Sequence, residues 1–327
     1  MIAILSWVGL SLLIGCSFPE TSIAATSAYA QTTEGLDLDR VQFVVSAPPE
    51  FTSRLSRHAR SLFAKAGIAL PDSEGQDRPP IATLTLTLDP QPLRDSCPEH
   101  ILYAPSLALT EPVLIPRNSV IMTNVTWLAH TGAQVRKSVT FADLEHDLEE
   151  FMHQFVADYR AANAGSRSSI PGTAPASPHP DTLRQNSPAT TPEAIHSDST
   201  LKALRIDQLQ FAVSAGRFSR ALRPRALQQL DNAGLILLPD QHHNGQTTLG
   251  VELIQQPLED RCPGKVLYES GLYLVEQIQL MRNPRVSIWS DTWLRETTLV
   301  VAPRSQEQLE SDQEALLRQF IKALKTQ

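Results

Sequence analysis

The stretch PLRDSCPEHILY at residues 92–103 returns as PLEDRCPGKVLY at residues 257–268, an offset of 165 positions. Further matches keep the same order along the chain, beginning with VQFVVSA at 41–47 against LQFAVSA at 209–215. This offset is far longer than the repeat of a solenoid protein. With 327 residues the chain is also long enough for two domains. The sequence therefore predicts two copies of one whole domain.

Each copy predicts the same succession of elements. Residues 41–47 form a short apolar strand, and the apolar residues that follow have helical spacing until Gly67 ends the helix. The strict alternation TLTLTL at 83–88 predicts a strand with one buried face. Two longer strands and a final helix follow, and Ser305 and Gln308 have capping-box spacing at the start of that helix in the second copy. We therefore predict an α+β fold of two tandem β-α-β-β-β-α domains, each a two-layer sandwich.

The domain boundaries follow from composition. We expect an export signal at 1–30, a first α+β domain at 36–163 and a second at 201–327. Residues 164–200 between them are rich in Pro, Ser and Thr and lack apolar periodicity, so they predict a disordered linker.

The N-terminus leaves three forms of the exported chain open. An uncharged apolar run extends from Ile2 to Cys16. Cleavage before Cys16, at a sequence similar to a lipobox, would give a lipoprotein that is lipidated on this cysteine. Cleavage after Ala30 would release a soluble protein that starts at Gln31, and an uncleaved anchor is the third form. All three place the folded part outside the cytoplasm, in the periplasm, at the outer membrane through a lipid anchor, or secreted.

Charge and motifs exclude several classes of function. The net charge is −7, and no cluster of Lys and Arg interleaves with aromatic residues, so we expect no nucleic-acid partner. The sequence contains no nucleophile elbow, zinc-protease motif, phosphate-binding glycine loop or dinucleotide fingerprint. We therefore assign no catalytic, metal-binding or cofactor-binding residue and expect no cofactor.

Equivalent cysteines and charged residues are the candidate site residues. Cys97 and Cys262 could form a disulfide that clamps the two copies, or they could be an inherited pair that never meets. The repeated candidate surface consists of Glu111 and Arg117 in the first copy and Glu276 and Arg282 in the second. These residues could line a polar groove, but we favour simple pairing across a sheet surface. We expect the repeated aromatic residues, Tyr103, Trp127, Tyr268 and Trp293, to belong to the cores.

Some motifs of the first copy carry a resemblance to known proteins. Ala66-Gly67-Ile68 ends the first helix, Thr126-Trp127 lies in a strand, and QFVADYRAAN at 154–163 forms the closing helix. This pattern resembles a widespread group of uncharacterised secreted bacterial proteins, which have one such domain per chain and no established activity. The present chain departs from the group by its duplication, by a cysteine in each copy, and by KALKTQ at its end.

The leading hypothesis is an exported binding or adaptor protein of the bacterial cell envelope without catalytic activity. It would present a sheet edge, a sheet face or the cleft between the copies to an envelope protein partner. The alternatives are a periplasmic carrier of an apolar ligand and a hydrolase without a recognisable motif.

Overall fold

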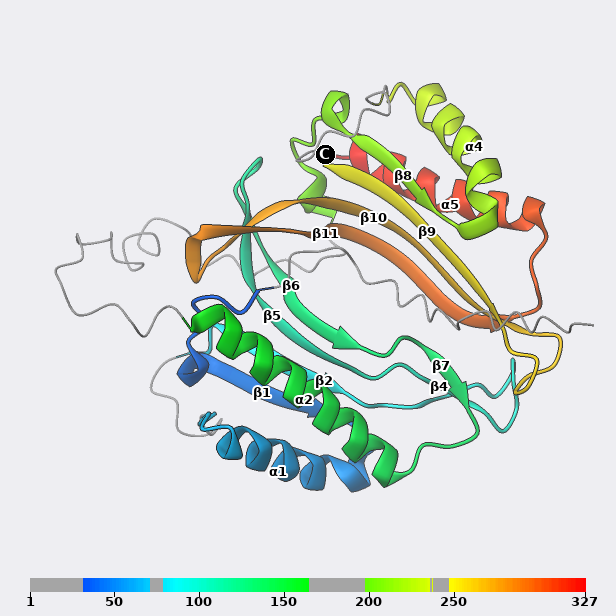
Figure 1. The fold of residues 1–327 in the computed structure, drawn as a ribbon. Coiled ribbons are helices and arrows are strands. Elements are labelled where there is room, and N and C mark those ends of the chain that lie inside the picture. The colour runs from blue at the N-terminus through cyan, green and yellow to red at the C-terminus, as the bar shows by residue number, and fades with distance from the viewer. Residues whose placement is uncertain (1–31, 71–78, 165–197, 236, 238–246) are drawn as a thin grey trace, which may run out of the picture.

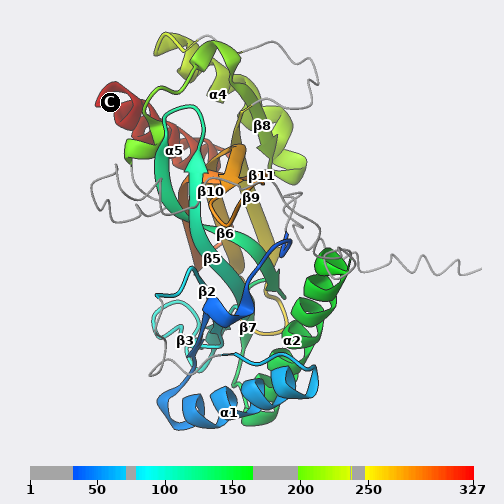
Figure 2. The same ribbon diagram turned by 90° about the vertical axis from the view of Figure 1, so that its left-hand side faces the viewer.

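The computed structural model describes residues 32–70, 79–164, 198–235, 237 and 247–327. It shows a mixed α+β protein, as predicted, with helix pairs at its two ends and strands between them (Figures 1 and 2). The predicted export signal at 1–30, including Cys16, lies outside the described residues. No described helix is both long and apolar enough to cross a membrane.

The first half is built from one helix after the first strand and another after the last strand. Its strands are β1 (Val41–Ser46), β2 (Ala82–Thr87), β3 (Gln91–Pro92), β4 (Ile101–Tyr103), β5 (Ser106–Ile115), β6 (Val120–His130) and β7 (Gln134–Arg136). Its α-helices are α1 (Pro49–Lys65) and α2 (Phe141–Asn163), and the 3-10 turn η1 (Leu38–Arg40) precedes β1.

The second half follows the predicted order β-α-β-β-β-α. Its strands are β8 (Gln210–Ser214), β9 (Thr248–Pro257), β10 (Val266–Leu280) and β11 (Asn283–Val301). Its α-helices are α4 (Ser219–Asn232) and α5 (Gln306–Lys325), and its 3-10 turns are η3 (Asp198–Leu201), η4 (Ile206–Gln208) and η5 (Gly216–Phe218).

Local sequence explains where the helices begin and end. Helix α1 ends just before Gly67, whose φ of +73° is a conformation that glycine adopts without strain. Helix α2 begins with a capping box between Thr140 and Asp143. The capping box predicted for Ser305 and Gln308 is confirmed at the start of α5.

The strands form a sheet with two equivalent wings. In the first wing β1 pairs parallel to β2, and β2, β5 and β6 pair antiparallel in that order. In the second wing β8 pairs parallel to β9, and β9, β10 and β11 pair antiparallel. Antiparallel pairing of Val113 and Leu114 in β5 with Leu280 and Gln279 in β10 joins the wings into one eight-stranded sheet.

The first half departs from the predicted three strands between its helices. Strands β3, β4 and β7 form a small separate sheet, whereas the equivalent segments of the second half are the ends of the continuous strands β9, β10 and β11. Pro90 and Pro105 lie at two of the breaks, and Gln255 and Ser270 stand at these positions in the second half. Proline has no N–H group for a ladder hydrogen bond, so it interrupts a central strand.

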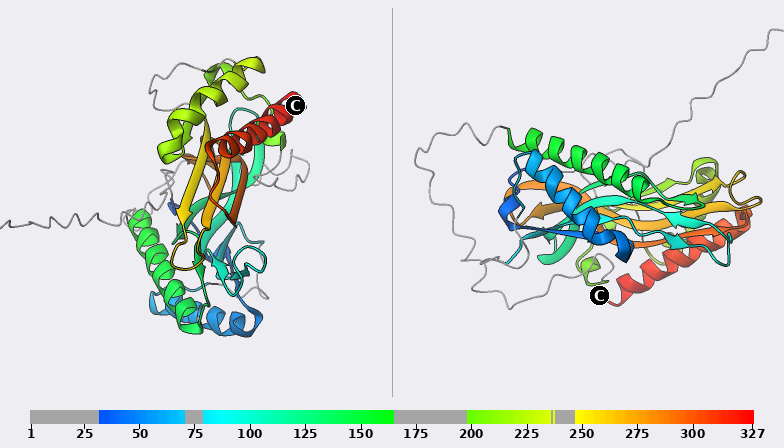
Figure 3. Two further views of the ribbon diagram at one scale, coloured as in Figure 1. Left: turned by 90° about the vertical axis from the view of Figure 1, so that its right-hand side faces the viewer. Right: turned by 90° about the horizontal axis from the view of Figure 1, so that it is seen from below.

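Each helix pair packs against its own wing of the sheet (Figure 3). The repeated aromatic residues are buried as predicted, with exposed fractions of 0% for Tyr103 and Trp293, 1% for Trp127 and 2% for Tyr268. Tyr103 and Trp127 belong to the first core and Trp293 to the second, whereas Tyr268 lies in a smaller cluster with Leu222 and Leu309. The indole of Trp127 donates to Asp158 in α2, at 2.9 Å, whereas that of Trp293 donates to Asp198 in η3, at 3.1 Å. The two cores therefore contain equivalent tryptophans, but the residue that accepts the indole hydrogen bond lies in a different element in each half.

The predicted linker at 164–200 lies mostly at residues 165–197, outside the described part of the chain. Its last residues belong to η3, where Thr200 is buried. The described chain continues from Asp198, and η3 spans the predicted boundary at 201. Composition assigns Ser199 and Thr200 to the linker, because most polar residues are exposed and their burial here cannot be read from residue type.

Candidate functional site

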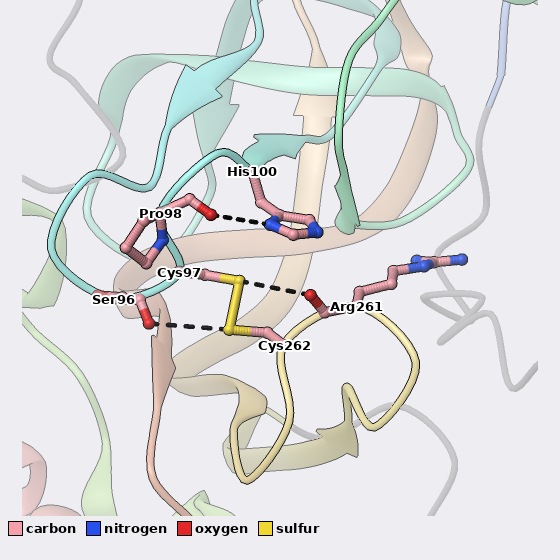
Figure 4. The surroundings of a disulfide bond; sticks show 6 residues. All are labelled: Ser96, Cys97, Pro98, His100, Arg261 and Cys262. Carbon is pink, nitrogen blue, oxygen red and sulfur yellow. Dashed lines mark hydrogen bonds between the residues drawn. A yellow bond between two sulfur atoms is a disulfide. The ribbon is translucent and has the colours of Figure 1, made fainter.

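A disulfide joins the two copies of the opening motif. Cys97 and Cys262 are bonded, and their Cα atoms are 5.9 Å apart. Sγ of Cys97 lies 4.0 Å from the carbonyl oxygen of Arg261, and Sγ of Cys262 lies 3.8 Å from that of Ser96 (Figure 4). A disulfide sulfur has no hydrogen to donate, so these are packing contacts. The symmetry of the contacts shows that two equivalent loops meet face to face.

The disulfide lies in a small apolar cluster to which both halves contribute equivalent residues. The buried members besides the cysteines are Val135, Leu258, Leu267 and Val300, and Leu93 and Leu102 pack against them. Exclusion of water from both loops favours their contact even before the covalent bond is considered.

The repeated charged residues pair crosswise between the halves. Arg117 donates from Nε to Glu276 Oε2, at 2.6 Å, and from Nη2 to Glu276 Oε1, at 2.9 Å. The second pair is Arg282 with Glu111, joined through Nη1 and Oε1. A threonine hydroxyl donates to each glutamate as well, from Thr126 to Glu111 and from Thr292 to Glu276. Sequence spacing favoured pairing within each copy; the structure corrects this, because each arginine lies at a hairpin tip that reaches the other half.

Each arginine also holds the first residues of the opposite half. Arg282 donates to the carbonyl oxygens of Thr32, at 2.9 Å, and Glu34, at 3.1 Å. Arg117 donates to the carbonyl oxygens of Thr200 and Lys202. The guanidinium groups thus satisfy both a carboxylate and main-chain acceptors, which a lysine ammonium cannot do in the same planar geometry.

The two ion pairs differ in burial. The side chains of Arg282 and Glu111 are 3% and 1% exposed, whereas those of Arg117 and Glu276 are 17% and 5% exposed. Burial raises the pKa of Glu111 above its ordinary value, and Arg282 and the Thr126 hydroxyl oppose this rise. Burial also lowers the pKa of Arg282, against the effect of Glu111. These residues therefore form an internal joint: the favoured pairing of glutamate with arginine is present, but it runs between the halves and not across the sheet surface of one copy.

Apolar and polar contacts between the β5–β6 hairpin and the β10–β11 hairpin complete the joint. Equivalent residues from the two hairpins form one buried cluster, namely Val113, Ile115, Met122, Ile278, Leu280 and Ile288. Where β6 and β11 meet, Asn124 Nδ2 donates to the carbonyl oxygen of Asp291, at 2.8 Å. The hydroxyl of Ser290 donates to the carbonyl oxygen of Val125, at 3.4 Å. The two wings are thus joined at the disulfide loops, at the crossed ion pairs and between the hairpins.

Strand β1 forms one outer edge of the joined sheet. The amide of Leu88 donates to the carbonyl oxygen of Ser46, at 2.7 Å, so the even-numbered residues of β1 turn their peptide groups toward β2. By alternation, the N–H and C=O groups of Phe43 and Val45 point away from the sheet. Within the described part of the chain, no strand pairs with this side of β1.

Strand β8 forms the opposite edge. The amide of Gln210 donates to the carbonyl oxygen of Thr247, at 2.9 Å, so Phe211 and Val213 turn their peptide groups outward. Arg223 of α4 donates from Nη1 to the carbonyl oxygen of Phe211, at 3.0 Å. The two edges are therefore equivalent in position, but on β8 the Arg223 side chain donates a hydrogen bond to an outward carbonyl group.

Comparisons with known proteins add little to this geometry. No protein-family model and no curated protein matches the chain. Among solved structures, a crystal structure of a minor lipoprotein from Acinetobacter baumannii aligns with 36% of this chain and 92% of its own chain. The aligned residues are 16% identical and the TM-score is 0.18, which is too weak to support an argument about function.

Sequence reasoning identified Cys97 and Cys262 as a possible disulfide pair and singled out the four charged residues of the joint, but it did not identify the residues that the arginines bind. The acceptors Thr32, Glu34, Thr200 and Lys202 act through main-chain carbonyl groups, which leave no trace in side-chain identity. Arg223 was missed for a similar reason, since its acceptor is the carbonyl group of Phe211. One signal was available in the sequence: Thr32 and Thr200 lie at the same distance before the matching motifs that begin at Val41 and Leu209.

Proposed function

We propose that the protein is an exported binding or adaptor protein of the bacterial cell envelope, without catalytic activity, and that it binds a protein partner through the outer edge of its sheet. The observation that carries this proposal is the edge of β1, where Phe43 and Val45 direct peptide groups away from the sheet. An extended segment of another protein can form main-chain hydrogen bonds with such an edge.

The disulfide supports a location outside the cytoplasm. Cys97 and Cys262 are both buried, and structural disulfides between such residues persist in oxidising compartments. The location is the periplasm or the outer membrane through lipidated Cys16, or else a soluble form that starts at Gln31.

Tandem duplication of one domain explains the symmetry of the joint. Equivalent residues meet at the disulfide, in the crossed ion pairs and in the apolar cluster between the hairpins. Two copies of a domain that once associated as a twofold dimer would produce this reciprocity after fusion, because a twofold interface uses the same residues on both sides.

The carrier alternative requires an apolar cavity. Among the described residues, the pocket beside Trp293 is lined by mostly polar side chains, including Asp198, Arg295, Gln319 and Lys322, and does not favour that alternative. The repeated residues Glu111, Arg117, Glu276 and Arg282 are paired inside the joint.

In-cell crosslinking tests the proposal. The full chain is expressed at its native level, crosslinked in the intact cell and purified, with an unrelated exported protein of similar charge as the control. We expect one envelope protein to be enriched over that control. If no protein is enriched at native expression, the adaptor proposal is abandoned. The intact mass of the same purified protein shows whether the chain starts at lipidated Cys16 or at Gln31.

A further inference from the structure

Two aromatic residues of the second wing lie on its far face, the side of the sheet turned away from α4 and α5. Leu272 and Leu274 of β10 belong to the core under these helices, so Tyr273 between them points to the far face. Ile288 of β11 is buried, so Trp289 beside it points to the far face as well. Both aromatic side chains are partly exposed, and within the described part of the chain neither belongs to an apolar cluster.

The ring of Tyr273 rests on the neighbouring strand. Tyr273 pairs with Gly250 of β9, and its ring leaves no room for a Cβ atom at position 250. A ring that covers a backbone in this way turns its other π face outward. The face of an aromatic ring attracts an ammonium or guanidinium group that lies over it.

Three carboxylates lie beside this ring on the far face. Glu252 of β9 and Glu296 of β11 both pair with Gly271 of β10, and Glu269 precedes Gly271 by two residues. A Cβ atom on Gly271 would approach no other atom more closely than 3.9 Å, so there is room above this glycine. The two flanking glutamates therefore border a gap that no side chain of β10 fills.

The charge of these glutamates is not compensated. Burial raises the pKa of Glu252, and Glu296 raises it further. Burial also raises the pKa of Glu269, and both other glutamates add to the rise. No basic side chain among the described residues opposes either rise or pairs with the three carboxylates, in contrast to the arginine beside Glu111. Like charges on neighbouring strands destabilise a sheet, so the fold itself does not account for them.

The first wing lacks this arrangement. In place of the two aromatic residues it has Ala108 and Thr123, and in place of the three glutamates it has Thr87, Ala104 and His130. The copies thus share their joint and their buried tryptophans but differ on this face. The aromatic and acidic residues are therefore no requirement of the domain fold.

We propose that the far face of the second wing binds a basic segment of a partner protein. An arginine or lysine side chain of that segment would lie between Glu252 and Glu296 and another over the ring of Tyr273, while Trp289 would contact their apolar stems. This surface does not include β1, so the inference goes beyond the proposed edge and does not depend on it.

Other occupants fit this face less well. A second copy of the chain that packed the same face against it would bring two sets of three uncompensated glutamates together. The carboxylates are also spread over three strands, and no group of acidic, histidine or cysteine side chains in the described ranges is arranged to hold a metal ion. A chain segment that carries several positive charges suits this spacing.

The test uses the full oxidised chain and two peptide probes of equal length. In the basic probe arginine alternates with serine, and in the neutral probe glutamine replaces arginine. Binding is measured by fluorescence anisotropy at low and at physiological ionic strength. Glu252→Gln removes one carboxylate, and Tyr273→Ala and Trp289→Thr introduce the residues of the first wing. Glu259→Gln is the matched control, since Glu259 is exposed in the disulfide loop and its loss changes the net charge equally.

We expect the basic probe to bind the natural chain and the neutral probe to bind at least about tenfold more weakly. Glu252→Gln, Tyr273→Ala and Trp289→Thr should each weaken binding of the basic probe about threefold or more, whereas Glu259→Gln should leave it unchanged. Glu252→Gln is decisive, because relief of charge repulsion should make this variant more stable, so its loss of binding cannot come from unfolding.

Several results would overturn the proposal. These are equal binding of both probes, no binding of the basic probe below about 1 mM at low ionic strength, and equal losses in Glu252→Gln and Glu259→Gln, which would show attraction by net charge alone. A dimer in sedimentation that Trp289→Thr dissociates would identify a second copy as the occupant. Displacement of the basic probe by an equimolar amount of calcium would identify a metal site.

Failure of this inference can be told apart from failure of the adaptor proposal. If in-cell crosslinking captures an envelope partner that Glu252→Gln and Tyr273→Ala capture equally well, the adaptor function stands and the far face is not its site. If the basic probe binds at the far face but no partner is captured at native expression, the far face binds basic segments and the adaptor proposal is wrong.

Discussion

Replacement of Arg282 by methionine tests the buried half of the joint most directly. The variant Arg282→Met keeps an unbranched side chain of similar length but removes the charge next to Glu111, which is 1% exposed. It also removes the hydrogen bonds to the carbonyl oxygens of Thr32 and Glu34. Loss of one partner of a buried ion pair leaves an uncompensated charge, so we expect the free energy of unfolding to fall by about 3 to 5 kcal/mol.

Three comparisons make this expectation specific. Arg117→Met should cost less, because the Arg117 side chain is 17% exposed and water can reach that pair more easily. The double variant Glu111→Gln/Arg282→Met should be more stable than the sum of the two single variants implies, by at least about 1 kcal/mol. The cost should also depend on pH. Burial raises the pKa of Glu111, and removal of Arg282 raises this pKa further. The free energy of unfolding of the variant therefore falls as the pH rises above 4.5, the ordinary pKa of a glutamate.

The measurement is urea unfolding of the oxidised protein at pH 4.5 and pH 7.5, followed by circular dichroism. The expected cost of Arg282→Met is larger at pH 7.5 than at pH 4.5. A cost below about 1 kcal/mol at both values, or one that does not change with pH, would show that the pair is hydrated and does not join the halves as described.

Three further predictions concern other parts of the structure. Cys97→Ser/Cys262→Ser removes a crosslink across 165 residues and should lower the free energy of unfolding by up to about 5 kcal/mol, the chain-entropy limit, as measured by urea unfolding; an unchanged midpoint would contradict it. Tyr103→Phe removes a buried 2.6 Å hydrogen bond to Asp147 and should cost about 1 to 3 kcal/mol by the same assay, while equal stability would show that Asp147 is satisfied without it. Burial and nearby Glu296 raise the pKa of Glu252, so Glu252→Gln should stabilise the protein by up to about 1 kcal/mol at pH 7; this gain should vanish in thermal melts as the pH falls through 4.5, and a gain independent of pH would refute the cause.

The local elements were predictable because their signals are local. All but the last residue of the alternation at 83–88 lie in β2. The apolar spacing after residue 49 lies in α1, which ends where Gly67 allows a left-handed backbone. Strand interruptions in the first half were also encoded, in Pro90 and Pro105, but the matching second half, with Gln255 and Ser270, obscured them. A repeat therefore guides the alignment of elements and conceals the places where the copies diverge.

The joint was only half predictable. Equivalence marked Cys97, Cys262 and the two Glu-Arg pairs as important, yet sequence spacing cannot distinguish a pair within one half from a pair between halves. That choice is made by the geometry of the β5–β6 and β10–β11 hairpins, whose tips carry Arg117 and Arg282 past the partner wing. The difference between the two sheet edges was out of reach, since the acceptor for Arg223 is a main-chain group.

The crossed arginines also determine when this chain can finish folding. Arg282 bonds to residues that precede it by 250 and 248 positions, so a chain that emerges with its N-terminus first must wait for the β10–β11 hairpin before Thr32 and Glu34 are held. Until then Glu111 lacks its counter-charge, and the first half is incomplete although nearly all of its own residues are present. We therefore expect both halves to reach the native state late and together, and to unfold cooperatively as one unit, in contrast to two independently folded domains on a tether.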